Sequence, residues 1–560
     1  MNKLTKPIKL LILVSAVCFV FFVMNWSFML DRRSSPEDFS VSKKNELAFS
    51  RYTPPVELSF VKEFSEEDDL LNHLPGETLE DNRWTRLYEQ ELGIKIRYEW
   101  IADGEVYYKK FGMVLASGRI PDVVRVNAQQ LRQLSNAGLI QDLTAVYEQN
   151  ASSFTRDTLG EEGSGPFEAA TIDGKLMGIP QTASSIEGAQ FLWIRTDWLE
   201  RLGLDPPDTM DDLLKLSKAF TEDDPDGNGV DDTYGLAATN YLWDPVAGLA
   251  DFMAGYGAYP NLWLKEPDGQ MVYGGIQPQV KTALASLQKL YVSGQMDPEF
   301  SLQDGGKVKK IVGAGKIGIV YGEQWASFWL QLSREQNPEA QWRAYPVVSA
   351  TGSKARVPLP FATNQFFAVR KDYEHPEALI KMFNLYLKTN WGRTADYKTY
   401  YSNPYAVWGL SPVTPAPGRK NLNAFYQLEH GRRTGDFSGL SDEAESIKRM
   451  IDIYQRGGED KESGWGWERI YGPEGAFPVL NQYIRNNQLL YESFVGSPTE
   501  TMLEKNTLLI NMQLDTYMDI ILGSPLDEFD RFTEEWGRLG GTEMTDEVNR
   551  WYDGQTKESK

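Results

Sequence analysis

The stretch AQFLWIRTDWLERLGL, residues 189–204, decides the fold class because it passes directly from a predicted strand into a predicted helix. Gly203 stands where the helix should end, since glycine readily adopts the left-handed conformation that closes many helices. The next segment, residues 209–220, predicts a second helix with Thr209 as its N-cap, and Asp212 three residues later completes a near capping box. These patterns together predict a strand followed by two helices.

The same alternation of strands and helices extends to both sides of this stretch. The predicted strands read VELSFVKEF, GIKIRYEW, IPDVVRV and GKIGIVYG, and PLPFATNQFFAVR reads as extended chain. The predicted helices read NRWTRLYEQEL, YKKFGMVLASG, AQQLRQLSNAGLIQDL and PQVKTALASLQKLYVSG, and the chain turns strongly helical from Glu374 onward. Strands that alternate with helices predict an α/β fold with a mainly parallel sheet.

Length and composition argue against several classes of protein. A chain of 560 residues, 41% of them hydrophobic, is long enough for two or more domains. Its 79 acidic and 57 basic residues leave a formal charge of −22, which repels phosphates, so we expect no nucleic-acid partner. With three histidines and one cysteine, Cys18, the chain offers little material for a histidine base or a cysteine nucleophile, and no internal disulfide can form.

The N-terminal segment, residues 1–30, predicts a membrane anchor. Lys3, Lys6 and Lys9 precede an apolar run over residues 10–30, which at about 1.5 Å per residue reaches about 30 Å and spans a hydrocarbon core. No small-x-small cleavage site follows the run, which favours a retained anchor over a cleaved signal peptide. Because the lysines outweigh the two arginines that follow, we expect the N-terminus in the cytoplasm and the remaining chain outside the cell.

Cys18 raises the alternative of lipidation. Bacterial lipidation needs a small residue directly before the cysteine, but Val17 stands there, and the run continues as CFVFFVMNW where a polar tether should begin. We therefore favour a cysteine buried in the membrane. Residues 31–55 are polar without a sustained period and predict a tether, so folding should start near Val56.

The loop DPDGNGVDD, residues 224–232, has the pattern of a calcium site. A hard cation such as Ca²⁺ takes about six to eight oxygen ligands at about 2.3–2.6 Å, which alternate residues of a tight loop can provide. The expected ligands are the side chains of Asp224, Asp226, Asn228 and Asp232 and the carbonyl of Val230. Gly235 stands where an EF-hand carries its last glutamate, so we expect no complete EF-hand, and a metal-free Asp/Gly turn is the alternative. In either case the role of the loop would be structural.

Six stretches, in order along the chain, resemble one known family. They read LASGRIPDVVRV, DGKLMGIPQ, WIRTDWLERLGLDPPDTMDDL, DPDGNGVDDTYG, GKIGIVYG and LDEFDRFTEEWGRLGGTEMTDEVNRWY. Together they look like the large extracellular solute-binding proteins of bacterial ABC transporters, most of all the carbohydrate-binding, lipoprotein-type members common on Gram-positive surfaces. Some of these relatives carry a glutamate at the position that matches Thr233 in the calcium loop. The resemblance therefore adds Thr233 to the candidate metal residues, although the neutral threonine should weaken calcium binding here.

The resemblance implies a periplasmic-binding-protein-like type II fold, in which two α/β lobes joined by a hinge close on a ligand, with a helical C-terminal part. It places residues 56–180 and about 366–474 in lobe 1, and residues 181–365 and about 475–560 in lobe 2. The implied function is capture of a carbohydrate, without chemical change, for delivery to an ABC permease by a monomeric protein. Members of the family are usually held by a lipid on a cysteine, and the poor match around Cys18 puts that anchoring in doubt.

Candidate ligand residues follow from the chemistry of sugars, whose C–H faces stack on aromatic rings while polar side chains bond the hydroxyls. In open α/β lobes ligands bind beyond the carboxyl ends of strands, so Trp325, which follows the strand GKIGIVYG, ranks first. The further candidates are Trp243, Tyr241, Trp329, Trp465, Trp467, Gln181, Glu323, Asn364 and Gln365. Core packing is the alternative for every ring, and a solvated loop is the alternative for the polar residues. Arg195 and Asp197 indicate instead an ion pair or cap at a helix start.

Two other functions stay open. The acidic residues could include the paired carboxylates of a secreted polysaccharide-active enzyme, although no HExxH, nucleophile elbow or phosphate loop is present. A membrane-anchored sensor that presents a sugar to a receptor kinase would also suit the retained N-terminal helix. The net negative charge argues mildly against a polyanionic sugar, unless a local basic cleft overrides it.

Overall fold

The computed structural model describes residues 47–64, 70–402 and 406–558. The chain divides into two compact units, residues 1–47 and residues 48–560. The predicted N-terminal membrane helix, residues 1–30, and Cys18 within it lie outside the described residues. Within the described ranges, no helix combines the length and the apolar character needed to cross a bilayer.

The unit of residues 48–560 contains two hydrophobic cores, and each core defines a lobe. The core of the first lobe draws its buried residues from the ranges 58–179 and 366–413. The core of the second lobe draws them from the ranges 186–359 and 422–548. Within the described residues, the chain therefore crosses between the lobes three times, at residues 180–185, 360–365 and 414–421.

The first lobe is built from short strands with helices around them. Its strands are β1 (Val56–Glu63), β2 (Ile94–Ala102), β3 (Val123–Val126), β4 (Thr171–Ile172), β5 (Lys175–Leu176), β6 (Ile179–Pro180) and β14 (Phe366–Val369). Its helices are α3 (Arg83–Leu87), α4 (Gly104–Ser117), α5 (Ala128–Asn136), α6 (Thr144–Asn150), α7 (Ser153–Leu159), α8 (Gly165–Ala170) and α16 (Glu377–Trp391). β1 and β2 pair in parallel, and β14 lies between β3 and β6.

The second lobe is built around a four-stranded sheet. Its strands are β7 (Phe191–Arg195), β8 (Tyr234–Leu236), β9 (Trp263–Lys265), β10 (Met271–Tyr273), β11 (Ile317–Gly322), β12 (Trp342–Tyr345), β13 (Val357–Leu359) and β15 (Leu489–Tyr491). The sheet has the order β12-β7-β11-β8. Its earlier helices are α9 (Thr196–Leu202), α10 (Met210–Glu222), α11 (Ala250–Ala254), α12 (Pro278–Val292), α13 (Gly305–Gly313), α14 (Ser327–Leu330) and α15 (Ser333–Gln336).

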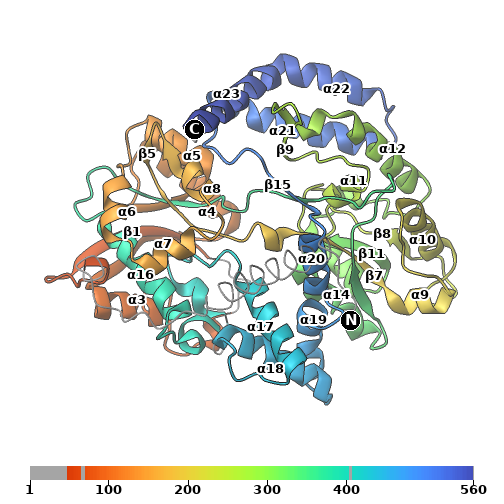
Figure 1. Ribbon diagram of the computed structural model, residues 1–560, viewed down its shortest axis with the longest axis horizontal. Coiled ribbons are helices and arrows are strands. Elements are labelled where there is room, and N and C mark those ends of the chain that lie inside the picture. Colours follow the sequence, from red (N-terminus) through yellow and green to blue (C-terminus); the bar gives the residue numbers. More distant parts are fainter. Residues whose placement is uncertain (1–46, 65–69, 403–405, 559–560) are drawn as a thin grey trace, which may run out of the picture. The chain divides into compact units, whose positions relative to one another are not determined.

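The C-terminal helices also belong to the second lobe. They are α17 (Lys420–Thr434), α18 (Asp442–Arg456), α19 (Glu462–Tyr471), α20 (Ala476–Arg485), α21 (Glu500–Ile521), α22 (Glu528–Trp536) and α23 (Thr542–Glu558). α19 and α20 pack against β12. α21 packs against α12 and α22 (Figure 1). The helical C-terminal part predicted from the sequence is thus confirmed, and it completes the second core.

The strand and helix predicted over residues 189–204 are confirmed as β7 and α9. Gly203 closes α9 in the left-handed conformation, with φ of 66°. Thr209 caps α10 by accepting a hydrogen bond from the Asp212 backbone N–H at 3.2 Å. The local signals of this stretch therefore gave the correct elements.

The prediction of a mainly parallel sheet is wrong. Among the nine strand pairs of the described residues, six are antiparallel, including both pairs of β14 and both that β7 makes in the four-stranded sheet. The prediction assumed that each strand is reached through a crossover helix, which forces parallel pairing. β14 instead arrives from the second lobe through the crossing segment 360–365, so its direction is free of that constraint.

The first lobe includes residues that were expected to belong to a tether. The Tyr52 backbone N–H donates to the Leu92 carbonyl at 2.8 Å, and the Asn384 side chain donates to the carbonyl of fully buried Ala48 at 2.9 Å. Residues 48–55 therefore include packed positions, such as Ala48, ahead of Val56. A polar segment without apolar periodicity is held here by hydrogen bonds, which the sequence pattern does not reveal.

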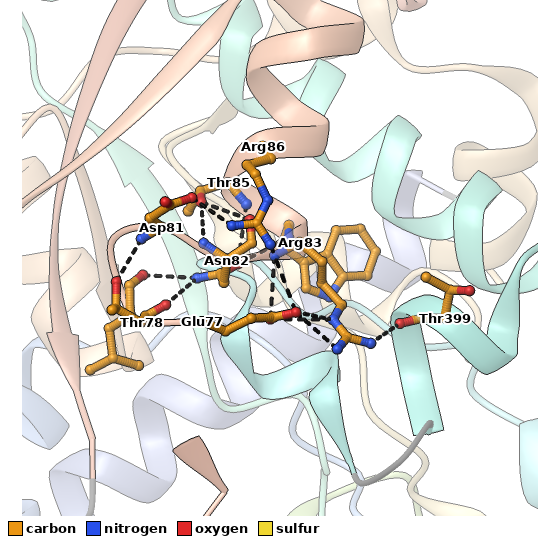
Figure 2. Close-up of polar contacts among 10 residues, drawn as sticks. Glu77, Thr78, Asp81, Asn82, Arg83, Thr85, Arg86 and Thr399 are labelled. Atoms are coloured by element: carbon orange, nitrogen blue, oxygen red, sulfur yellow. Dashed lines mark hydrogen bonds and ion pairs between the residues drawn. The ribbon is translucent and has the colours of Figure 1, made fainter. Parts of the chain in front are cut away.

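A capping box fixes the start of α3. Figure 2 shows the Asn82 side chain accepting hydrogen bonds from the first turn of α3, with the Thr85 hydroxyl accepting from the Asn82 backbone N–H at 2.9 Å. Arg83 donates to the Thr399 carbonyl and to the Glu77 carboxylate. The bond to Thr399 ties α3 to a segment more than three hundred residues later in the chain, within the same lobe.

Hydrogen bonds join the three crossing segments to one another. The Gln181 backbone N–H donates to the Gln365 carbonyl at 2.9 Å, and the Thr182 hydroxyl donates to the Ala416 carbonyl at 2.9 Å. The third crossing lies between Val413 and Leu422, well before residue 475, where the sequence analysis placed its last lobe boundary. The three segments form the connection expected of a hinge.

Candidate functional site

A cavity of about 500 Å³ lies against two of the crossing segments, and we call it the hinge cavity. Its polar and aromatic lining comprises Ser184, Ser185, Glu187, Gln190, Trp243, Asp251, Asn261, Glu323, Gln324, Phe361 and Asn364. A second cavity, of about 470 Å³, shares Ser185 and Phe361 with it and reaches Glu161 and Glu162 of the first lobe. Taken together, these two adjoining cavities are lined by residues of both lobes.

The end of β11 positions the acidic part of the hinge cavity. Glu323 directly follows Gly322, the last residue of β11, and its backbone N–H donates to the Pro245 carbonyl at 2.9 Å. This bond holds the loop that carries Trp243 next to the strand end. A side chain at Gly322 would meet Ala326 at 2.9 Å, so only glycine allows this close turn.

Burial raises the proton affinity of the acids in the hinge cavity. The pKa of Glu323 rises from 4.5 to about 7, chiefly through burial, and the negative charge of Glu187 adds to the rise although Trp325 donates a hydrogen bond of 2.7 Å. Asp251 is 2% exposed, and burial together with the charge of Glu323 lifts its pKa well above the ordinary value. Burial therefore favours the protonated, neutral forms of Glu323 and Asp251 in this cavity.

Glu187 of the hinge cavity also contacts the start of α17. Its carboxylate accepts hydrogen bonds from the backbone N–H groups of Asn421 and Leu422 at 3.0 and 3.1 Å, at the first turn of α17. Burial raises the pKa of Glu187 to about 7, against the opposing charge of Lys420. Lys420 itself pairs with Glu443 at 2.8 Å. Glu187 therefore joins the hinge cavity to the third crossing segment.

Three acceptor oxygens in the hinge cavity have no hydrogen-bond partner. They belong to Gln190, Asp251 and Asn261. The Gln190 amide N–H donates to the Asp244 carbonyl at 3.2 Å, which leaves its oxygen unpaired although the residue is only 7% exposed. Buried polar atoms are normally paired, so these oxygens indicate a place for donors from a bound molecule.

The structure places the predicted ligand residues in three settings. Trp243, Glu323 and Asn364 line the hinge cavity. Trp325 lies beside it, bonded to Glu323 and in edge contact with Trp329 at 5.9 Å. Not among the residues that line the hinge cavity are Tyr241, Trp329, Gln181, Gln365, Trp465 and Trp467.

Two of the tryptophans that do not line the hinge cavity pack against other side chains. Trp465 is fully buried, and the guanidinium groups of Arg334 and Arg469 lie 5.5 and 5.7 Å from its ring centre, as the core-packing alternative describes. Trp467 packs against Phe328 and Tyr471. Neither ring is carried into the proposed site.

Arg195 and Asp197 form the structural pair that the sequence indicated. The Arg195 guanidinium donates to both carboxylate oxygens of Asp197, at 2.6 and 2.8 Å, and stacks over Trp198 at 4.4 Å. Their role at the start of α9 is confirmed.

Sequence reasoning missed Gln190, Asp251 and Asn261. Asp251 stands alone as an acid within the apolar segment VAGLADFMAG, residues 246–255, and a lone acid in a buried helix is a signal that could have found it. Gln190 and Asn261 carry no such signal, because their unpaired oxygens become apparent only once the lobe has folded.

The side chains of the predicted calcium loop turn toward one another. The Asn228 amide donates to Asp226 at 2.9 Å and to Asp232 at 3.3 Å, and the Gly229 backbone N–H donates to Asp224 at 3.0 Å. Burial, with like charge from Asp232 and Asp224, raises the pKa of Asp226. The donors are carboxylate and amide oxygens, which suit a hard cation.

Other features of this loop limit the donor set. The Thr233 hydroxyl donates to the Phe220 carbonyl at 2.8 Å and is buried against α10, which turns it away from the loop. Asp232 also pairs with Lys316, and Val230 is 55% exposed. In the described part of the chain, no three His, Cys, Asp or Glu side chains gather closely enough to hold a metal by themselves. The amide and carbonyl oxygens of the loop would have to complete the ligand set.

Comparison with known proteins identifies the family. The model of the bacterial extracellular solute-binding proteins matches residues 73–390. Lipoprotein LipO of Bacillus subtilis is 26% identical over 476 residues, covering 83% of this chain and 87% of the relative. The polygalacturonan/rhamnogalacturonan-binding protein YtcQ of the same organism is 26% identical over 467 residues, covering 82% and 86%.

Solved structures share the fold at low sequence identity. The Streptococcus pneumoniae substrate-binding protein FusA in complex with kestose has a TM-score of 0.59 at 16% identity, covering 90% of this chain and all of that one. The alginate-binding protein AlgQ2 without calcium ion has a TM-score of 0.60 at 15% identity, covering 90% and 99%. These likenesses show a common fold.

Proposed function

The chain belongs to the bacterial extracellular solute-binding proteins, and from this premise we propose that it captures an oligosaccharide outside the cell and delivers it unchanged to an ABC transporter permease. One observation carries the proposal. The hinge cavity combines the indole of Trp243 with amide and carboxylate oxygens that lack partners, at the connection between two lobes. Relatives that bind polygalacturonan or fructooligosaccharide support the saccharide class.

The lining suits the two kinds of surface that a sugar offers. Trp243 is half-buried and presents a flat ring for the C–H face of a pyranose. Asp251 and Glu323 offer acceptor oxygens for hydroxyl groups, and a buried acceptor that gains a donor no longer carries its desolvation cost. Stacking and hydroxyl recognition therefore meet in one cavity.

Binding would act by closing the lobes. A ligand shifts a two-state equilibrium only through its better affinity for one state, and a saccharide held by both lobes favours the closed one. The second cavity supports this mechanism, because Glu161 and Glu162 of the first lobe face Leu359 and Glu492 of the second across it. The proposed lobes are residues 48–180 with 366–413, and residues 186–359 with 422–558.

Calcium would stabilise the second lobe. Asp224, Asp226, Asn228 and the Val230 carbonyl are the residues that would hold it, and Ca²⁺ would supply a fixed positive charge that ties the loop after α10 to β8. Two neighbours in fold concern calcium-related sites, namely AlgQ2 without calcium ion and a FusA EF-hand mutant. The ion would have no catalytic part.

The binding unit would face the outside of the cell. The family is extracellular, and the relative LipO is named a lipoprotein, which supports attachment to the outer face of the membrane. Retention of the N-terminal segment and lipidation at Cys18 are the two anchoring modes that the proposal allows.

The test is a ligand screen on the full chain, purified in detergent. A saccharide that binds the native state should raise the thermal midpoint by mass action. Mass spectrometry of the same samples should recover the saccharide intact. Shorter products would favour the polysaccharide-active enzyme, and a panel of neutral, amino and acidic oligosaccharides without any shift would reject saccharide capture.

A further inference from the structure

We propose that the bound oligosaccharide carries carboxylate groups, and that Arg356 and Arg419 hold one of these groups in a cavity beyond the second cavity. We call this third space the basic cavity; it has a volume of about 710 Å³ and is also lined by Lys265. The inference rests on the proposed function and names the substrate class of the same site, an oligosaccharide that contains uronate units.

The basic cavity continues a row that starts at the hinge cavity. The hinge cavity and the second cavity share Ser185 and Phe361, and the second cavity and the basic cavity share Ile186, Arg419 and Tyr491. Each of the three cavities is large enough for a small-molecule ligand. Such a row suits a saccharide of several units, which would occupy successive cavities.

The cations of this row gather at one end. Among the described residues that line the three cavities, Lys265, Arg356 and Arg419 are the only Lys, Arg or His, and all three line the basic cavity. Glu266 is the one acid in the described lining of the basic cavity. Three positive charges against one negative charge make this cavity locally positive, although the whole chain has a formal charge of −22. An acid group of a bound saccharide is therefore attracted to this end of the row.

The three cations have no acidic side chain as a partner. In the part of the chain that the structure describes, no carboxylate forms an ion pair with any of them. The Lys265 ammonium lies 4.8 Å from the ring centre of Tyr552, and the Arg356 guanidinium donates a hydrogen bond to the Leu489 carbonyl at 3.3 Å. Both of these partners are uncharged, so the positive charges remain available to an anion.

Arg419 connects the basic cavity to the third crossing between the lobes. It directly precedes α17, and its backbone N–H donates to the carboxylate of Glu161 in the first lobe. Burial and the charge of Glu162 raise the pKa of Tyr491, whereas the charge of Arg419 opposes this rise, so the guanidinium lies near that half-exposed ring. An acid group held by Arg419 would therefore contact the segment that joins the lobes.

The lining offers both kinds of contact that a uronate needs. A guanidinium presents a planar fork of N–H donors that can bond both oxygens of a carboxylate, whereas an ammonium acts as a point charge. Tyr259 and Tyr491 line the same cavity and offer flat faces to a pyranose ring. Burial raises the pKa of Tyr259 against the opposing charge of Arg356, so this ring and this cation are close together. Arg356 and Arg419 are therefore the residues assigned to the acid group, and Lys265 adds positive charge.

The first experiment compares matched ligands on the full chain, purified in detergent. Oligosaccharides of galacturonate, glucuronate and mannuronate are titrated by calorimetry, each beside the neutral product of reducing its carboxyl groups. At least one uronate should bind about 10-fold more tightly than its neutral counterpart, because two charge-assisted hydrogen-bonding groups are added. Raising the salt concentration should remove most of this advantage, because the three cations are exposed.

Each outcome of this comparison bears on a different proposal. Uronates that bind no more tightly than their neutral counterparts overturn the assignment of the basic cavity but leave saccharide capture standing. Binding by no saccharide overturns both proposals. Inorganic phosphate, titrated alone, separates a free anion from the acid group of a saccharide. If phosphate binds more tightly than every uronate oligosaccharide, the cavity is a site for a free anion and the inference fails.

The second experiment assigns the acid group to residues. Arg356→Gln and Arg419→Gln each remove one guanidinium and should each lower the advantage of the uronate over its neutral counterpart about 3-fold or more. The double variant should abolish the advantage. Arg356→Lys keeps the charge without the fork and should retain part of it. Both arginines are exposed, so the variants should fold, as circular dichroism will show.

Arg449→Gln is the matched control. Arg449 is exposed, donates to the Ser446 hydroxyl at 3.1 Å and lines none of the three cavities. Its loss removes one positive charge from the chain and should leave the advantage of the uronate unchanged. A folded double variant that keeps the full advantage, or a control that loses as much as Arg356→Gln, overturns the assignment to Arg356 and Arg419.

Discussion

Trp243 is the residue on which the proposed binding most depends. Its ring is half-buried, meets Tyr517 edge-on at 6.1 Å and lines the hinge cavity. Trp243→Ala removes the platform for stacking and should weaken saccharide binding about 10- to 100-fold by calorimetry. Trp408→Ala is the matched control, because Trp408 is 39% exposed and does not line the hinge cavity. Equal losses in both variants would contradict a specific role for Trp243.

The buried acids predict a dependence of stability on pH. Between about pH 4.5 and 7, Glu323 holds a proton in the folded chain that it releases in the unfolded chain, because burial raises its pKa to about 7. The folded state then binds more protons, so the free energy of unfolding falls as pH rises through this window. The groups that face Glu323 are Glu187, Asp251 and the Trp325 indole, and Lys420 acts through Glu187.

Glu323→Gln isolates this contribution. The variant cannot titrate at this position. Its free energy of unfolding should therefore fall less than that of the native chain between pH 5 and pH 8, and the difference between the two falls should be on the order of 3 kcal/mol at most. Glu299→Gln, at an exposed position, should follow the native chain. Parallel curves for the native chain and Glu323→Gln would show that Glu323 does not hold the proton.

Part of the candidate site could be predicted from residues alone. Trp243 and Glu323 follow strands of an α/β lobe, and the position of strand ends is a local property of sequence. Asp251, Gln190 and Asn261 are distinguished by burial and by the lack of a partner, which arise from tertiary packing. The same limit explains Trp465, whose position between Arg334 and Arg469 no local pattern encodes.

At the scale of elements, the loop of residues 224–232 makes a prediction about calcium. Calcium that binds only the folded chain should raise the free energy of unfolding by about 2.7 kcal/mol when its concentration is one hundred times the dissociation constant. The thermal midpoint should rise accordingly, and EDTA should reverse the rise. Asp226→Asn lowers the charge of the donor set and should reduce the calcium shift. Asp205→Asn, an exposed change outside the loop, should not. If calcium raised the thermal midpoint of Asp226→Asn as much as that of the native chain, the ion would have to bind outside this loop.

Elements were predictable where their signals are local. The cap at Thr209, the end of α9 at Gly203 and the existence of strand β1 arise from a few neighbouring residues, and all three appear as expected. Strand direction is a different kind of property. β14 pairs antiparallel with β3 and β6 because of where the chain comes from, and a pattern within one strand contains no such information.

At the scale of the whole molecule, the sequence predicts crossings between lobes near residues 181 and 365, whereas its last boundary, near residue 475, lies far from the third change of core in the described residues. The crossings near residues 181 and 365 adjoin strands, which made them visible as extended segments. The third, residues 414–421, precedes α17 without a strand, and its place is fixed by Glu187 holding the first turn of that helix. A contact between residues more than two hundred positions apart has no signature in either segment.

Three hydrogen-bonded crossings between two separate cores predict motion of the lobes as rigid bodies. Each lobe keeps its own core, so closure changes the backbone torsions of the crossings while the packing within each lobe persists.

Spin labels can be attached at Glu148→Cys in the first lobe and at Glu299→Cys in the second, in a chain that also carries Cys18→Ser. The distribution of distances between the two labels should change when a saccharide that binds the chain is added. Two labels within the second lobe, at Asp205→Cys and Glu299→Cys, should show no change. Because a ligand moves the equilibrium only through differential affinity, Trp243→Ala should need a higher saccharide concentration for the same shift. An unaltered distance between lobes at saturating saccharide would reject closure while leaving binding itself intact.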